Sequence, residues 1–157
     1  MNVNDVEKYF LMYGRSVTAA ALCYVRDPQD ADDIAQEVFF RLYTYSGRFD
    51  SDAHVKAWLI RCAVNRSKDL IRSPWRRRRL PLEAAADMQH SDGTEENDSM
   101  LAVLNKLGRN SRVALYMYYY EEYSTQEIAE ILGISVNAAS LRLRRGRQQL
   151  KKLLEKK

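Results

Sequence analysis

Apolar residues along the chain recur mostly three or four positions apart, which is the period of an amphipathic helix, and no stretch alternates as a strand does. The first half carries three such stripes, interrupted near residue 27 and again over residues 46–52. We therefore expect three helices with short connections, packed as a bundle over residues 1–73. The stripes are Val6, Phe10, Tyr13, Val17, Ala20 and Tyr24; Ala31, Ile34, Val38, Leu42 and Tyr45; and Val55, Leu59, Cys62, Ala63 and Leu70.

Local signals mark where these helices begin and end. Asp27 suits an N-cap and Pro28 the first helical position, because proline's fixed φ is already helical. A third helix is expected from about residue 53 to 72, after a loop over residues 46–52. It ends at Ser73, since the residue before Pro74 is biased away from the helical region.

The second half begins with a change of composition. Residues 87–98 hold five acidic residues, no basic residue and little that is apolar. Such a segment cannot bury enough surface to order itself, so residues 74–98 are expected to be a flexible linker. The helical pattern resumes at Ser99 and predicts a four-helix domain over residues 99–157. The expected fold class is all-α, with two small helical domains.

Residues 124–147 have the layout of a DNA-binding helix-turn-helix. A short amphipathic helix ends at Gly133, where a tight turn needs a residue that tolerates positive φ. Ser135 then caps a second helix with four arginines in six residues, a density suited to phosphate and base-edge contacts. Just upstream, Tyr116, Tyr119, Tyr120 and Tyr123 recur at helical spacing and are expected to be mostly packing residues.

Charge is segregated along the chain, although its sum is only +4. Residues 27–37 carry five acids and no base, whereas residues 137–157 carry eight bases and a single acid, Glu155. This pattern favours two partner surfaces of opposite sign. The chemistry of the acidic face stays open between metal ligands or an acid–base pair, a solvated helix face, and a docking surface for a basic partner helix with Phe39 and Phe40 adding apolar contact.

The third predicted helix combines basic and aromatic side chains. Arg61, Asn65, Lys68 and Arg72 follow one helix face, which is either a solvated stripe or a groove for single-stranded nucleic acid. Trp58 is equally compatible with the core and with base stacking. The run Arg76–Arg79 either neutralises phosphates or is a passive part of the linker.

Other classes of function lack support in the sequence. The serines have no paired histidine, no glycine-rich phosphate loop is present, and Cys23 and Cys62 form no CxxC pair. We expect no enzyme activity, no metal, no cofactor and no small-molecule substrate. The N-terminus has no signal-peptide pattern and no run of eighteen apolar residues occurs, so the expectation is a cytoplasmic protein without membrane insertion.

Three motif blocks together resemble a bacterial RNA polymerase sigma factor of the extracytoplasmic-function (ECF) group of the sigma-70 family. Residues 30–39, DADDIAQEVF, are similar to a signature of region 2, and residues 57–72, AWLIRCAVNRSKDLIR, resemble the block that follows it. The third block is the helix-turn-helix, which takes the place of region 4. The blocks stand in the family's order and cover nearly the whole chain.

The resemblance implies partners and contact residues. Core RNA polymerase would be bound through its β′ clamp helices and β flap, promoter DNA at the −10 and −35 elements, and an anti-sigma factor would regulate the chain. The polymerase contacts would be Asp30, Asp33, Gln36, Glu37 and Phe39. The −10 contacts would be Arg48, Phe49, Trp58, Arg61, Asn65, Arg66, Lys68 and Arg72. The −35 contacts would be Ser135, Asn137, Ala138, Ser140, Leu141, Arg142, Arg144, Arg145 and Arg147.

The chain departs from the family pattern at three places. Leu107-Gly108 replaces a common Leu-Pro, and Ala138 to Leu143 differ from the usual recognition helix, so base preferences do not carry over. Gly146 replaces a usual alanine and is expected to weaken its helix by about 1 kcal/mol. The alternative function is a stand-alone helix-turn-helix regulator whose N-terminal domain senses a signal or dimerises.

Overall fold

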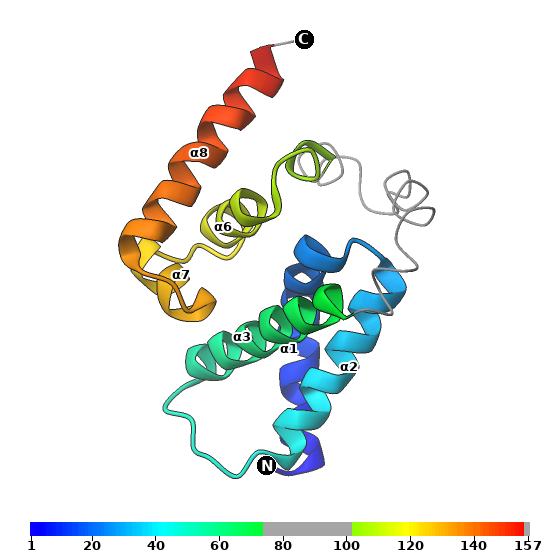
Figure 1. The fold of residues 1–157 in the computed structure, drawn as a ribbon. Coiled ribbons are helices and arrows are strands. Elements are labelled where there is room, and N and C mark those ends of the chain that lie inside the picture. Colours follow the sequence, from blue (N-terminus) through cyan, green and yellow to red (C-terminus); the bar gives the residue numbers. More distant parts are fainter. Residues whose placement is uncertain (74–101, 156–157) are drawn as a thin grey trace. The chain divides into compact units, whose positions relative to one another are not determined.

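The computed structural model describes residues 1–73 and 102–155, and every regular element in these two ranges is a helix (Figure 1). The all-α expectation is therefore confirmed. The chain divides into two compact units, residues 1–80 and 81–157, and each is considered by itself. The predicted linker over residues 74–98, with its run Arg76–Arg79, lies outside the described residues.

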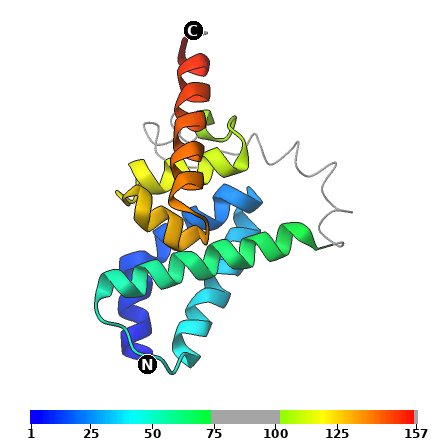
Figure 2. The same ribbon diagram turned by 60° about the vertical axis from the view of Figure 1, so that its left-hand side comes forward.

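The first unit is a bundle of three helices, as expected. They are α1 (Val3–Val25), α2 (Pro28–Thr44) and α3 (Asp52–Arg72), and α3 lies across the other two (Figures 1 and 2). A side chain caps each helix: Asn2 accepts from the Asp5 amide at 2.8 Å, Asp27 from Gln29 at 3.0 Å and Ser51 from His54 at 3.1 Å. The prediction of Asp27 as a cap with Pro28 after it is confirmed.

The core of this unit comes from the predicted stripes, with exceptions at their ends. Phe10 is 52% exposed, and Leu70 is only half-buried. Tyr45 follows the last residue of α2 in an extended conformation, with φ −72° and ψ 128°. Its ring packs against those of Phe49 and Trp58. The fully or largely buried members of the stripes are Val17, Ala20, Tyr24, Ala31, Ile34, Val38, Leu42, Val55, Leu59, Cys62 and Ala63.

The two cysteines are buried free thiols. Burial raises the pKa of the Cys62 thiol, and the nearby Arg41 and Arg61 only partly oppose this. A thiol held in its protonated form is a weak nucleophile, so Cys62 acts as a small apolar core residue.

The second unit is built from helices α6 (Arg109–Tyr119), α7 (Thr125–Leu132) and α8 (Val136–Glu155), preceded by helical residues 102–104. Figure 2 shows the end of α8 extending beyond α6 and α7. The buried guanidinium of Arg112 donates to the carbonyl of Leu107 at 3.2 Å, which fixes the turn that leads into α6. The core of the unit includes Leu104, Leu107, Val113, Leu115, Tyr116, Met117, Ile128, Ile131, Leu132 and Leu143.

One expectation about this unit was wrong in part, and Gly146 has a packing role in addition to the expected one. Of the tyrosines expected to pack, Tyr116 is buried and Tyr123 half-buried, but Tyr119 is 55% and Tyr120 38% exposed. Gly146 is buried where α8 crosses α6, and a Cβ added there would lie 2.8 Å from Cδ1 of Leu115. The glycine thus permits close packing of two helices, beyond its effect on helix propensity.

Candidate nucleic-acid interface

The acidic face predicted on α2 is present and accessible. Asp33, Gln36 and Glu37 are exposed and Asp30 is half-buried. Asp33 accepts a hydrogen bond from Nε2 of Gln29 at 3.2 Å, a contact within the same helix. These groups lie on one side of α2 because they are three and four residues apart.

The two phenylalanines beside this face have different environments. Phe39 is only 6% exposed, and its ring meets that of Phe10 edge to face at 5.2 Å between centroids. Phe40 is 67% exposed. The aromatic surface next to the acids is therefore Phe40, a residue that the list of predicted contacts left out.

The basic stripe on α3 is largely accessible, whereas Arg66 beside it is paired. Arg61, Asn65 and Arg72 are exposed, and Lys68 is half-buried. Arg66, which is also half-buried, instead turns towards α2 and donates from Nε to Oε2 of Glu37 at 2.6 Å. This hydrogen bond raises the pKa of Arg66, the partial burial of the group opposing it. One predicted DNA contact and one predicted polymerase contact therefore hold each other in this structure.

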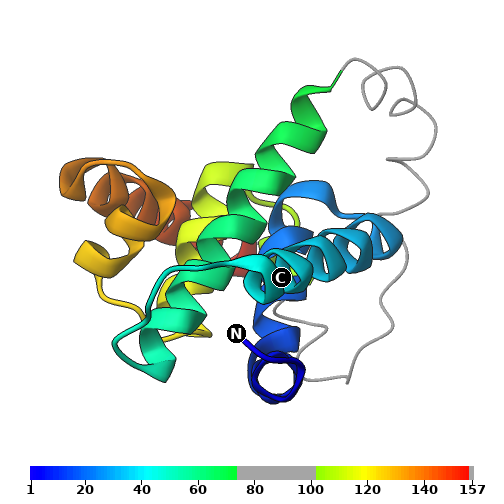
Figure 3. The same ribbon diagram turned by 90° about the horizontal axis from the view of Figure 1, so that it is seen from below.

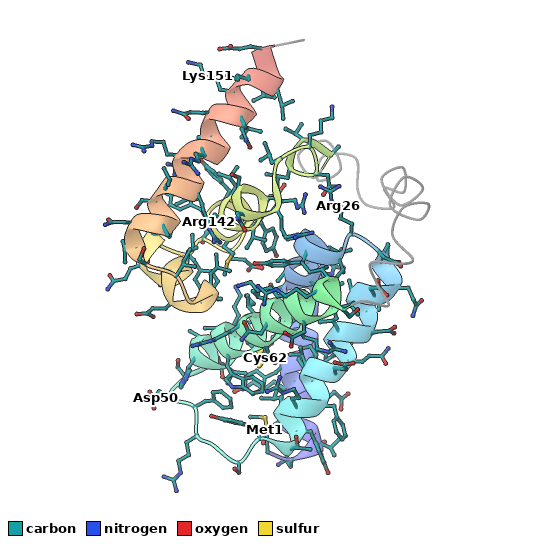
Figure 4. All side chains as sticks on the ribbon, viewed as in Figure 1. Met1, Arg26, Asp50, Cys62, Arg142 and Lys151 are labelled. Atoms are coloured by element: carbon teal, nitrogen blue, oxygen red, sulfur yellow. The ribbon has the colours of Figure 1, made fainter. Side chains whose placement is uncertain are left out.

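An aromatic cluster links the loop between α2 and α3 to the start of α3, and we define it as Tyr45 and Phe49 of the loop with His54 and Trp58 of α3. The ring of Phe49 lies 5.2 Å from Tyr45, 5.1 Å from His54 and 5.7 Å from Trp58, measured between centroids. Tyr45 also contacts Trp58 at 4.9 Å. Figures 1 and 3 show this loop as an extended segment joining the two helices. Arg48 is exposed on it, and Asp50, labelled in Figure 4, precedes the start of α3.

Sequence reasoning missed three residues that shape this loop. The sequence pattern indicates no role in the loop for His54 or Gly47, and it places Tyr45 in the stripe of the preceding helix. The ring of Tyr45 lies so close over Gly47 that an added Cβ would collide with it. The glycine in a loop between two aromatic residues was the available signal, but it does not say which ring covers it.

The helix-turn-helix of the second unit has the predicted caps and turn. Gly133 has φ 69°, and Ser135 Oγ accepts from the Ala138 amide at 3.0 Å. In addition, Ser124 and Glu127 form a reciprocal capping box at the start of α7. Two orphan amides are satisfied in this way, which fixes the first helix of the motif.

Helix α8 presents most of the predicted −35 residues to solvent. Ala139, Leu143 and Gly146 face the core of the unit. The opposite face is exposed or half-buried and is the side that a DNA groove would meet. Its exposed members are Ser135, Asn137, Ser140, Arg144, Arg145 and Arg147, and its half-buried ones are Ala138, Leu141 and Arg142, the last labelled in Figure 4.

Arg147 differs from the other arginines of α8 because it is held by α6. Its Nε donates to the Tyr119 hydroxyl at 3.1 Å, and its guanidinium carbon lies 5.0 Å from the ring centroid of Tyr118. This arrangement combines a hydrogen bond with a cation–π contact. Tyr118 and Tyr119 are therefore neighbours of the predicted DNA face, which their helical spacing alone did not indicate.

Two further features are absent from residues 1–73 and 102–155. Within that part of the chain no group of three or more His, Cys, Asp or Glu side chains is placed to hold a metal ion. No helix there is long and apolar enough to cross a membrane.

Comparison with known proteins covers both units. Residues 9–77 match Sigma-70 region 2 and residues 97–150 match Sigma-70, region 4. The chain is 35% identical over 144 residues to the probable RNA polymerase sigma factor RfaY of Xanthomonas campestris, covering 84% of this chain but only 36% of that longer protein. It is 32% identical over 151 residues to the ECF RNA polymerase sigma factor SigW of Bacillus subtilis, covering 85% and 81% of the two chains.

A solved structure agrees with these matches. The sigma factor CnrH of Cupriavidus metallidurans, in complex with the cytosolic domain of CnrY, superposes with a TM-score of 0.70 at 26% identity, covering 98% of this chain and 90% of that one. Region 2 coincides with the three-helix bundle and region 4 with the helix-turn-helix unit. The chain belongs to the sigma-70 family of RNA polymerase sigma factors, in its extracytoplasmic-function group.

Proposed function

We propose that this chain is a non-catalytic promoter-specificity subunit that binds core RNA polymerase and directs it to promoters with particular −10 and −35 elements. The observation that carries the proposal is that three exposed charged surfaces lie on three different helices. Acids occupy α2, bases occupy α3, and a second basic face occupies α8 behind a Ser135 cap. Such a chain would act in the cytoplasm, where polymerase and promoter DNA meet.

The acidic face is assigned to the basic partner. Asp33, Gln36 and Glu37 would meet the clamp helices of the β′ subunit, with the exposed ring of Phe40 beside them. Complementary charge steers such an encounter and fixes its orientation. Region 4 would make the second contact with the polymerase, at the β flap.

The two basic surfaces are assigned to promoter DNA. Arg61, Asn65 and Arg72 of α3, with the loop that carries Arg48, would hold the opened −10 strand. The exposed face of α8 would enter the major groove at −35. The domain limits proposed for these tasks are residues 1–73, 74–98 and 99–157.

Regulation by an anti-sigma protein forms part of the proposal. The related CnrH is bound by the cytosolic domain of CnrY, which supports a protein partner for this chain as well. Competition for the same surfaces would keep the chain from polymerase until that partner is removed.

Capture of core polymerase tests the docking assignment. Asp33→Lys reverses a charge on the proposed face, and Asp32→Lys, also exposed on α2 but outside the proposed contacts, is the matched control. We expect Asp33→Lys to lose most of the capture and Asp32→Lys to retain it. Equal capture by both variants would refute the docking face.

A gel shift on promoter DNA, with and without core enzyme, tests the dependence on polymerase. Strong binding by the free chain alone would support the stand-alone regulator instead.

A further inference from the structure

The loop between α2 and α3 is tied down at several points. At its start, the backbone amide of Tyr45 donates to the Leu42 carbonyl at 3.2 Å. At its end, the Asp50 amide donates to Nδ1 of His54 at 3.1 Å, while the His54 amide donates to Oγ of Ser51. Between these points, Phe49 packs within the aromatic cluster defined above.

The cluster lies at the edge of the bundle. Tyr45 is 38% exposed, and Phe49 and Trp58 are half-buried, whereas the neighbouring Val55 and Leu59 are almost fully buried. Val55 and Leu59 belong to the buried core of the unit, whereas the cluster lies outside it. The aromatic contacts tie the loop to α3. Ordering a loop of this length costs conformational entropy, and these contacts offset that cost.

Contacts within the cluster limit what Trp58 can do. Its indole has Tyr45 at 4.9 Å and Phe49 at 5.7 Å between centroids, so two side chains of the protein already pack on it. Arg48, by contrast, is exposed next to the anchored Phe49.

We propose that Tyr45, His54 and Trp58 are positioning residues, which hold loop 46–51 in the conformation that reads one base of the opened promoter strand. Phe49 anchors the loop and Arg48 and its neighbours meet the nucleotide. Gly47 belongs to the same device, because a Cβ at this position would push the Tyr45 ring out of its place over the loop. A loop ordered before binding loses less conformational entropy in the complex, which favours both affinity and discrimination. This inference rests on the proposed promoter-reading function and assigns residues to it.

Selection from single-stranded DNA tests the assignment. The probe is a pool of oligonucleotides with a short randomised segment, captured by core polymerase loaded with each variant. Tyr45→Leu and His54→Ala are expected to reduce the base preference at one position by about tenfold, which is the scale of one base-reading contact. Tyr45→Phe, which keeps the ring, should restore it. Tyr43→Leu, an exposed aromatic residue of α2 outside the cluster, is the matched control.

The outcomes separate the loop assignment from the proposed function. A residue that merely stabilises the fold would weaken selection at all positions together and lower the amount of chain bound to core enzyme, and that result would overturn the proposal. Unchanged preferences in Tyr45→Leu and His54→Ala would overturn it as well, while the proposed function would stand. A wild-type holoenzyme that selects no sequence would overturn the proposed function and the loop assignment with it. Gly47→Ala provides a third variant with the same expected loss, should Tyr45→Leu fail to fold.

Discussion

Arg66 of α3 holds Glu37 of α2 with both sides of its guanidinium fork, at 2.6 Å from Nε to Oε2 and 3.5 Å from the terminal nitrogen to Oε1. The two residues are 29 positions apart in sequence and belong to different proposed surfaces, one for DNA and one for polymerase. Both side chains remain accessible to solvent, at 38% and 51% exposure. Each charge is therefore partly neutralised in the free chain and available for exchange with a partner.

Removing the arginine is expected to strengthen polymerase binding. Arg66→Gln frees the Glu37 carboxylate for a basic partner, and exposed ion pairs are worth about 0.2–1 kcal/mol, so the Kd for core enzyme should fall by up to about fivefold. Fluorescence anisotropy of a labelled chain titrated with core polymerase measures this directly.

A second arginine of α3 is the control for this prediction. Arg61→Gln removes the same charge from an exposed position of the DNA stripe, and solvent screening over about 8–10 Å should leave core affinity unchanged. Both variants should weaken binding to single-stranded DNA. If Arg66→Gln does not bind core enzyme more tightly than Arg61→Gln, the exchange of partners is refuted.

Two left-handed backbone positions around α7 predict opposite changes in stability. Glu122 has φ 59° and Gly133 has φ 69°. A side chain in this region costs about 1–2 kcal/mol, which glycine avoids. We expect Glu122→Gly to raise the free energy of unfolding by about 1 kcal/mol and Gly133→Ala to lower it by a similar amount. Urea denaturation followed by circular dichroism measures both, and a change of the same sign in the two variants would contradict the backbone argument.

Tyr9 couples the stability of the first unit to high pH. Its hydroxyl donates to Oδ1 of Asp52 at 2.7 Å, and this hydrogen bond, aided by desolvation and by the charge of Asp52, raises the pKa of Tyr9 from 10.0 to about 12. The stabilisation is complete below pH 10 and is lost as the pH rises from 10 to 12, because the folded state then holds a proton that the unfolded state has released. Both groups are accessible, so solvent screening limits the contribution to about 1 kcal/mol or less.

Phenylalanine at this position provides the test. Tyr9→Phe should lower the free energy of unfolding near neutral pH by about 0.5–1 kcal/mol. The variant has no hydroxyl at this position, so its stability should not change through ionisation of residue 9 above pH 10. The two unfolding curves should therefore converge between pH 10 and 12 in urea titrations. A constant difference between wild type and variant over that range would show that the Tyr9 hydroxyl is not involved.

Local sequence patterns were sufficient for the helices of the first unit and for two of the N-caps. The stripes predicted α1, α2 and α3, and Asp27 and Ser135 act as the expected N-caps. Gly133 adopts the left-handed conformation that its place in the turn requires. These features depend on residues within four positions of one another, and such short-range relationships can be read from one sequence.

Features that depend on two distant elements could not be predicted in this way. The pairing of Glu37 with Arg66 and the contact of Arg147 with Tyr118 and Tyr119 each join different helices. Periodicity shows which side of a helix is apolar, but not which neighbouring side chain a charged group reaches. The same limit applies to Tyr45, whose ring direction is decided by the end of α2 and by the loop that follows.

Gly146 and Gly14 should respond in opposite ways to the same substitution. Both lie within helices, where alanine is favoured over glycine by about 1 kcal/mol. A Cβ at Gly14 of α1 would lie 3.7 Å from the Phe10 ring, an ordinary contact, so Gly14→Ala should stabilise the chain by about 0.5–1 kcal/mol.

At Gly146 the Cβ would lie 2.8 Å from Cδ1 and 3.0 Å from Cγ of the buried Leu115. Moving that side chain costs about 1–3 kcal/mol, which exceeds the gain in helix propensity. We therefore expect Gly146→Ala to lower the melting temperature and Gly14→Ala to raise it, both measured by calorimetry. In the double variant Gly146→Ala, Leu115→Ala the clash is relieved, so the loss of stability should be smaller than the sum of the two single losses. A rise in melting temperature for Gly146→Ala would mean that α6 and α8 separate without cost.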